Sequence, residues 1–387
     1  MGAPFALRAV VPARLRIAGL GAPMYARPMR FLDWLRPAVR PDFPQPDQQT
    51  FLLWEPCSAS HGEIVPGYAS YLRALGYKVV VLMTPDRIEE GLFSRFDMQG
   101  ITLSRLTQKQ IRRLMRQGGA QGAAGVLVST AGKLPDRPDG TVDLDAVFAG
   151  NAPGRVLLVE HDAKGRIDAG AWSPCMITLR ELEYQGQPSI VVNPHDFGQV
   201  TLKDKVAGRA VFVMVGAARA KRRNQNMVFD AAGALLDQGV TDFEIRMIGK
   251  PGGDPLPDRL KDHVIQLGRL DFTRMYDEVE RADFVLTAFQ GDNPDHDFYR
   301  TTGTTGAFQL CYGFAKPCVV QERFCHLTAL NADNSLTYGT DAEMAACLRA
   351  GVEMGTEDYA AKRDAMQRDA AALRAASLTA LKGLIDG

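Results

Sequence analysis

The sequence predicts an α/β protein of two Rossmann-like domains, each a doubly wound parallel sheet, with a cleft between them. The first observation is the length of 387 residues, which suits two domains of roughly 100–200 residues each. The second is that the strand-length segments are almost continuously apolar, as parallel strands are when helices cover both faces. The third is that strands alternate with helices, and that this alternation starts again after residue 206.

The first half of the fold is expected to begin after the proline-rich stretch 41–46. Residues 51–54 and 78–83 are apolar and predict two buried strands, and the helix between them is expected to end at Gly76 because glycine suits a helix end. The expected elements, in chain order, are strand 51–54, helix 68–75, strand 78–83, helix 108–117, and strands 125–129, 155–159 and 189–192.

The second half repeats this pattern, and the boundary between the halves is expected between Asn193 and Val206. The expected elements are strand 210–215, helix 226–236, strands 243–248 and 264–267, helix 272–282, strand 283–286, helix 305–314 and strand 318–321. The expected domains are a basic, proline-rich leader (1–48), an N-terminal domain (49–200), a C-terminal domain (201–356), and terminal helices (357–387) that pack back toward the N-terminal domain.

Composition narrows the class of protein. Lys and Arg total 45, as do Asp and Glu, so charge gives no reason to expect a nucleic-acid partner. The six cysteines contain no CxxC pair, so neither a zinc site nor a disulfide framework is predicted, and no metal or cofactor is expected. No apolar run reaches the roughly 18 residues that span a bilayer. We therefore expect a cytoplasmic protein.

The first forty residues differ from the rest, because they carry seven arginines, no lysine and a single acid, Asp33. Interleaved apolar residues are compatible with peripheral contact with anionic lipid at the inner membrane face. The alternative, which we favour, is a poorly ordered leader, because the prolines interrupt any long helix. The oligomeric state is left open.

Anion-binding residues are expected at the strand ends of the second half, because open parallel sheets bind ligands beyond the carboxyl ends of their strands. After strand 210–215 a glycine and a basic cluster precede a helix, and a threonine-rich segment precedes helix 305–314. Glycine, cations and the N–H groups of a helix start together suit a diphosphate. The candidates are Gly216, Arg219, Lys221, Thr302, Gly303, Thr304 and Thr305.

Two further strand ends pair a glycine with a cation. Strand 243–248 is followed by Gly249 and Lys250, and strand 264–267 by Gly268, Arg269 and Leu270. A loop of this kind can present its backbone to the edge of a nucleobase, so we expect Gly249, Lys250, Arg269 and Leu270 to contact a nucleoside.

A helix followed by Gly313-x-x-Lys316-Pro317 and an apolar strand resembles the donor-binding half of GT-B-type glycosyltransferases, of the group 1 or family 4-like kind. The resemblance covers roughly residues 194–351. It implies a nucleotide-sugar donor, with its diphosphate at Arg219, Lys221 and residues 302–305. Many retaining members carry two paired glutamates, whereas Thr302 and Leu310 stand at those places here.

The first half is then expected to hold the acceptor and a general base. Its strand-end loops contain His61, Glu63, His161 and Asp162, and an imidazole or carboxylate there can accept the proton of an attacking hydroxyl. The implied function is glycosyl transfer to a glycan, lipid-linked or other acceptor, in bacterial-type polysaccharide or glycoconjugate synthesis. A nucleotide-sugar epimerase and a non-catalytic nucleotide-sugar-binding protein remain alternatives.

Overall fold

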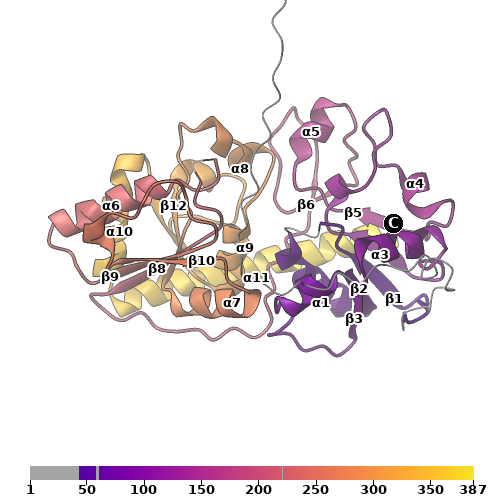
Figure 1. Cartoon of the computed structure of the whole chain (residues 1–387), viewed down its shortest axis with the longest axis horizontal. Helices are drawn as coiled ribbons and strands as arrows, with labels where there is room; N and C mark the ends of the chain where they lie inside the picture. Colours follow the sequence, from indigo (N-terminus) through magenta and orange to yellow (C-terminus); the bar gives the residue numbers. More distant parts are fainter. Residues whose placement is uncertain (1–42, 58–60, 220) are drawn as a thin grey trace, which may run out of the picture. The chain divides into compact units, whose positions relative to one another are not determined.

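The computed structural model describes residues 43–57, 61–219 and 221–387. The two predictions made for the arginine-rich leader concern residues outside these ranges. The first main sheet lies in the N-terminal half and has the strand order β3-β2-β1-β4-β5, with all neighbours parallel (Figure 1). Its strands are β1 (Thr50–Trp54), β2 (Lys78–Met83), β3 (Ile101–Arg105), β4 (Gly125–Val128) and β5 (Val156–Leu158).

The second main sheet has the order β10-β9-β8-β11-β12-β13, again fully parallel. In both sheets the first strand lies in the middle, so the chain order reverses next to β1 and next to β8. Such a reversal point is where open α/β sheets bind ligands. The strands are β8 (Ala210–Val215), β9 (Phe243–Ile248), β10 (Val264–Gly268), β11 (Phe284–Leu286), β12 (Cys318–Gln321) and β13 (Ser335–Tyr338).

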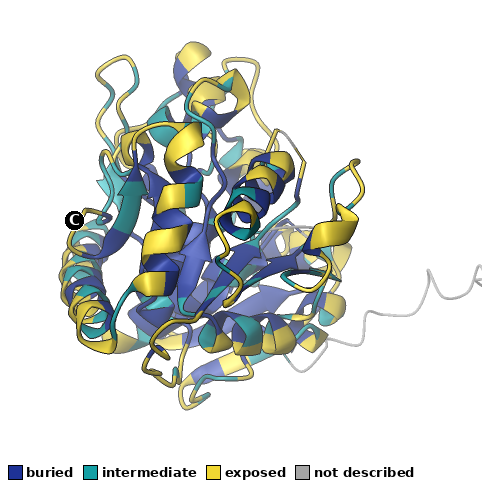
Figure 2. Ribbon diagram, turned by 90° about the vertical axis from the view of Figure 1, so that its left-hand side faces the viewer, coloured by how far each residue is buried: buried dark blue, intermediate teal, exposed yellow. Residues whose placement is uncertain are grey.

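Helices cover the sheets, and Figure 2 shows their outer faces exposed over strands that are buried. In the N-terminal half they are α1 (Val65–Ala74), α2 (Pro85–Glu89), α3 (Gln108–Arg116), α4 (Leu144–Phe148) and α5 (Ala163–Asp168). In the C-terminal half they are α6 (Gln225–Asp237), α7 (Phe272–Arg281), α8 (Phe298–Thr301), α9 (Gly306–Phe314), α10 (Met344–Glu353) and α11 (Thr356–Asp386).

The core of the second sheet explains why its strands read as continuous apolar runs. Phe212 of β8 packs into the layer with α6 and α10, whereas Val213 packs into the opposite layer with α7 and α9. Successive side chains of a strand point to opposite faces, and both faces here are covered. Phe212 also stacks on Phe284 of the neighbouring strand, with ring centroids 5.3 Å apart.

Helix α11 contacts the cores of both halves. Its early residue Met366 is buried in the second-half core, and its late residues Leu381 and Ile385 are buried in the first-half core. The alanine-rich terminal segment forms one continuous helix of 31 residues, which is how it contacts both cores. None of the helices in the described ranges is long and apolar enough to cross a membrane.

The structure departs from the expected elements at several places, among them the short helices α2, α4, α5 and α8, which were not predicted. Residues 189–192 were expected to close the first sheet, but β7 (Ile190–Val191) pairs only with β6 (Ile177–Thr178), in a separate two-stranded sheet. Strand β3 was not predicted, because it is an edge strand whose sequence Ile-Thr-Leu-Ser-Arg is half polar and half exposed. Strand β13 and helix α10 were missed as well.

Candidate functional site

Three glycines form a side-chain-free floor at the carboxyl ends of β8, β9 and β10. Gly216, Gly249 and Gly268 have φ angles of 129°, 130° and 67°, which other residues rarely adopt. The N–H of Gly249 donates to the carbonyl of Gly268 at 2.8 Å. A Cβ on Gly249 would lie 2.2 Å from the carbonyl oxygen of Gly216. The strand ends are thus packed backbone to backbone, and a ligand can approach them closely.

Arg223 lies in the turn between β8 and α6, and its side chain is buried, with 5% exposed. Its Nη2 donates to the hydroxyl of Thr305 at 2.6 Å, and its Nη1 donates to the carbonyl of Arg222 at 2.6 Å. The guanidinium lies 4.6 Å from the ring centroid of Phe289 and 5.6 Å from that of Tyr299. The aromatic rings therefore hold the guanidinium plane beside the start of α9.

No carboxylate in the described ranges pairs with Arg223, and its Nε has no hydrogen-bond partner. Burial lowers the pKa of the guanidinium, and the opposing contribution of Tyr299 is smaller. A buried cation without a counter-ion is costly. A bound anion at this position would supply the missing partner.

The threonine-rich segment lies against this arginine. Thr305 is the N-cap of α9, and its hydroxyl accepts from the N–H of Ala307 at 3.3 Å. Thr302 is buried, and its hydroxyl has no hydrogen-bond partner among the described residues. Gly303 has a packing role, because a Cβ there would meet the ring of Phe298 at 2.0 Å; Thr304 is half-buried. The first N–H groups of a helix lack intrahelical partners and attract anions.

Arg219 and Lys221 are both exposed in the turn that follows β8, and neither forms an ion pair within the described ranges. The carbonyl of Arg219 accepts from the N–H groups of Arg222 and Arg223, both at 2.7 Å. These bonds fold the turn so that Arg223 points inward while the other cations face solvent. The sequence could not distinguish them, and Arg223 was missed for that reason.

The predicted nucleoside-binding residues have different surroundings. Gly249 and Gly268 line a small cavity with Gly216, and Lys250 beside them is exposed. Arg269, however, donates to the carboxylate of Glu90 at 2.6 Å. Leu270 is half-buried and packs against the second-half core. Because the charge of Arg269 is paired with that of Glu90, its side chain is less available to a ligand than the backbone of Gly249 and Gly268.

Two of the predicted catalytic residues form a histidine pair. The rings of His61 and His161 lie with their centroids 4.1 Å apart. His161 Nε2 lies 2.8 Å from the carbonyl oxygen of Ser129, and it must donate because a carbonyl only accepts. Burial lowers the pKa of both imidazoles to about 4, and nearby cations such as Arg222 add to this for His61. Both rings are neutral at pH 7, and His161 Nδ1 keeps its lone pair.

Glu63 brings the loop before α1 to the start of α9. Its Oε1 lies 3.4 Å from where a Cβ on Gly306, the first residue of α9, would stand. Its negative charge also contributes to raising the pKa of buried Tyr276, after burial itself. A half-exposed carboxylate thus faces the helix end that Thr305 and Arg223 flank. This is a suitable place for a general base.

Asp162 is exposed, and its side chain makes no capping bond to α5. The loop around it is held by buried Glu160, which the sequence prediction did not include. The carboxylate of Glu160 accepts from the N–H groups of His161 and Asp162 at 2.9 and 3.2 Å, and from Nε of Arg166 at 2.5 Å. Glu160 therefore positions the backbone of His161.

A second buried carboxyl group, Glu55, ends β1. It accepts from the hydroxyl of Ser129 at 2.5 Å and from the N–H of Cys57. Burial raises its pKa to about 8, so the group is largely protonated at neutral pH. Ser129 connects it to His161, because the Ser129 carbonyl accepts from that imidazole. In the sequence, the position of Glu55 directly after an apolar strand was the signal that could have identified it as a candidate site residue.

No protein-family profile matches the sequence, and no curated protein matches it. Solved structures do. AviGT4, a glycosyltransferase involved in avilamycin A biosynthesis, superposes with a TM-score of 0.53 at 14% identity, over 87% of this chain and 97% of that chain. An alpha-glucosyltransferase in complex with UDP and a 13-mer DNA containing an HMU base superposes with a TM-score of 0.52 at 10% identity, over 87% and 99%. The chain therefore has the fold of the GT-B glycosyltransferases, and the predicted fold class is confirmed.

Proposed function

We propose that this protein transfers a sugar from a nucleotide-activated donor to a hydroxyl of a glycan or lipid-linked acceptor, in bacterial-type polysaccharide or glycoconjugate synthesis. One observation carries the proposal: the guanidinium of Arg223 is buried, pairs with no carboxylate of the described ranges, and donates to the N-cap residue of α9. Together with the helix end, it suits a diphosphate. The two similar structures named above are glycosyltransferases, and one was solved with UDP.

In this proposal the donor lies along the carboxyl ends of the strands of the second sheet. Arg223 and the first N–H groups of α9 hold the diphosphate, while exposed Arg219 and Lys221 add positive charge from solvent. The nucleoside lies on the glycine floor near Gly249. As the bond to the sugar breaks, negative charge grows on the departing phosphate, and these fixed donors stabilise it.

In this proposal the acceptor lies against the loops that follow the strands of the first sheet. Glu63 is the proposed base, because its carboxylate lies beside the first residue of α9. It accepts the proton of the attacking hydroxyl as that oxygen bonds to the sugar. His161 and His61 are neutral and contribute polar groups without placing further positive charge near the base. Asp162 is exposed at the same loop edge and can contact the acceptor.

The proposal is tested by calorimetry with a panel of nucleoside diphosphates, followed by transfer assays with the sugars of the base that binds. Glu63→Gln is expected to bind the donor as the wild type does and to lose transfer. Glu357→Gln, which changes an exposed glutamate at the start of α11, is the matched control. Failure of every nucleotide to bind would contradict the proposal, and so would epimerisation of the donor without an acceptor.

A further inference from the structure

Helix α3 carries a basic face that the proposed mechanism does not use. Thr107 begins the helix with a capping box, in which its hydroxyl and Gln110 exchange hydrogen bonds with each other's backbone. Ile111 and Met115 are buried beneath the helix. The helix is therefore anchored at its start and along its inner face, which leaves the opposite face fixed and exposed.

Four cations occupy that face, at positions 109, 112, 113 and 116. Residues three, four and seven apart share one side of a helix, and at 1.5 Å per residue the stripe is about 10 Å long. All four side chains are exposed, and none pairs with a carboxylate of the described ranges. Like charges at this spacing destabilise a helix, so folding gives no reason for them. The stripe consists of Lys109, Arg112, Arg113 and Arg116.

The acidic residues of the neighbouring helix α4 do not neutralise the stripe. Helix α4 contacts α3, and its carboxylate Asp145 is bonded by Arg137 at 2.7 Å. Asp143, the N-cap of α4, accepts from the N–H of Ala146 and lies 3.7 Å from Nε of Arg137. The positive charge of α3 is thus left for a partner outside the fold.

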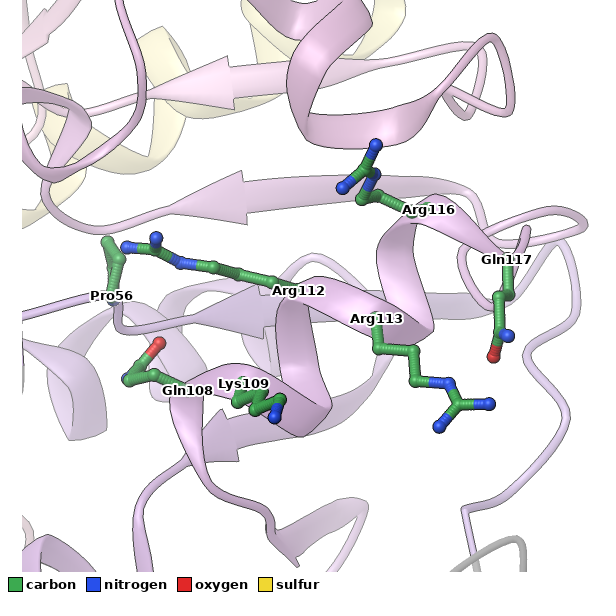
Figure 3. Close-up of a pocket in the computed structure, with 7 residues that line it drawn as sticks. All are labelled: Pro56, Gln108, Lys109, Arg112, Arg113, Arg116 and Gln117. Atoms are coloured by element: carbon green, nitrogen blue, oxygen red, sulfur yellow. The ribbon is translucent and has the colours of Figure 1, made fainter. Parts of the chain in front are cut away.

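The stripe borders a groove of about 770 Å³, shown in Figure 3. Apart from Pro56, the described side chains that line it are all polar, and Arg112 extends toward Pro56 (Figure 3). Gln108 fixes this end of the groove to β1, because its Nε2 donates to the carbonyl of Glu55 at 2.6 Å and its Oε1 accepts from Trp54 Nε1 at 3.2 Å. The groove therefore starts at the strand end that leads to His61.

We propose that this groove binds phosphate groups carried by the acceptor, and so that the acceptor is a phosphorylated saccharide. This rests on the proposed transfer function. Three arginines and a lysine match phosphate oxygens, because guanidinium groups bind them in a bidentate manner. The stripe lacks the aromatic and aliphatic side chains that insert into a bilayer.

The binding test uses inorganic tripolyphosphate as the probe, with the full-length protein at low salt. A saturating nucleoside diphosphate is present to fill the proposed donor site. Arg112→Gln/Arg116→Gln is expected to weaken tripolyphosphate binding at least tenfold. Arg274→Gln/Arg281→Gln removes the same charge from exposed positions of α7 and is expected to bind as the wild type does. Equal binding by the wild type and the α3 variant would overturn the proposal.

The acceptor test compares each candidate saccharide with its phosphorylated form in the transfer assay. The wild type is expected to have a KM at least tenfold lower for the phosphorylated form, and the α3 variant is expected to lose this preference while its kcat is retained. Absence of a preference in the wild type overturns the proposal. So does α3-dependent binding of vesicles of 30% phosphatidylglycerol in phosphatidylcholine, or of duplex DNA, since the groove would then serve a membrane or a nucleic acid.

The two proposals fail in different ways. The α3 variant leaves Arg223 and α9 intact, so its nucleoside diphosphate affinity is expected to match that of the wild type. If nucleotides bind and are used but phosphate has no effect, only the groove proposal fails. If no nucleotide binds, the transfer function fails, whatever tripolyphosphate does.

Discussion

Replacing Arg223 by methionine separates the energetics of folding from those of ligand binding. Methionine keeps an unbranched apolar chain against Phe289 but removes the buried charge. In the fold, the change loses the hydrogen bonds that the charged guanidinium donates to Thr305 and to the Arg222 carbonyl, each worth about 1.5–3 kcal/mol. It also removes a buried cation that no described carboxylate pairs with, which offsets the loss. We therefore expect the free energy of unfolding to change by no more than about 2 kcal/mol.

Binding should respond more strongly than folding. A hydrogen bond to a charged group contributes about 1.5–3 kcal/mol, and each 1.4 kcal/mol is about a tenfold change in affinity. Arg223→Met is expected to weaken nucleoside diphosphate binding by about 10- to 150-fold. The nucleoside diphosphate affinity of Arg223→Lys should fall between those of Arg223→Met and the wild type, because an ammonium keeps the charge but lacks the planar, forked donor geometry of a guanidinium.

The assay is calorimetric titration of the nucleoside diphosphate that binds the wild type most tightly, beside urea unfolding of the same samples. Arg274→Met, at an exposed position of α7, serves as the control for loss of one positive charge. A folded Arg223→Met protein that binds the nucleotide with wild-type affinity would refute the reasoning, since the buried guanidinium would then have no anion to hold.

Three further predictions follow from the same structure. Lys221→Ala should lose transfer and change the free energy of unfolding by less than about 0.5 kcal/mol, because the side chain is exposed; full activity would contradict its assignment. Gly249→Ala should destabilise by about 2–4 kcal/mol in urea unfolding, because its Cβ would meet the Gly216 carbonyl at φ 130°, whereas Gly253→Ala, with open space around it, should be nearly neutral. The folded pKa of His161 is about 4, below its unfolded value, so its contribution to stability is lost as pH falls from about 6.5 to 4. His161→Gln should therefore lose less stability than the wild type over that range, as measured by urea unfolding at a series of pH values. Identical slopes of the free energy of unfolding against pH would show that the imidazole is not buried in its neutral form.

The sequence alone determined the two parallel sheets. The runs 51–54, 78–83 and 210–215 are apolar at every or nearly every position because helices cover both faces of their strands, and this can be read without a partner strand. The glycines at the strand ends could also be recognised from the sequence, because a close backbone turn permits few other residues. An edge strand such as β3 carries no such signal, since half of it faces water.

Tertiary structure decided which charges matter. In the sequence, Arg219, Lys221, Arg222 and Arg223 form one basic cluster. Only the packing of Phe289 and Tyr299 shows that the guanidinium of Arg223 is buried, with no counter-ion among the residues that the structure describes. Likewise, Arg269 reads as a free cation until Glu90, 179 positions away, is found bonded to it. Burial and long-range pairing depend on which segments meet in space. The spacing of apolar and polar residues along one segment indicates only the secondary structure of that segment. The candidate base Glu63 and the helix start at Gly306 meet for the same reason, through a contact that no spacing in the sequence encodes.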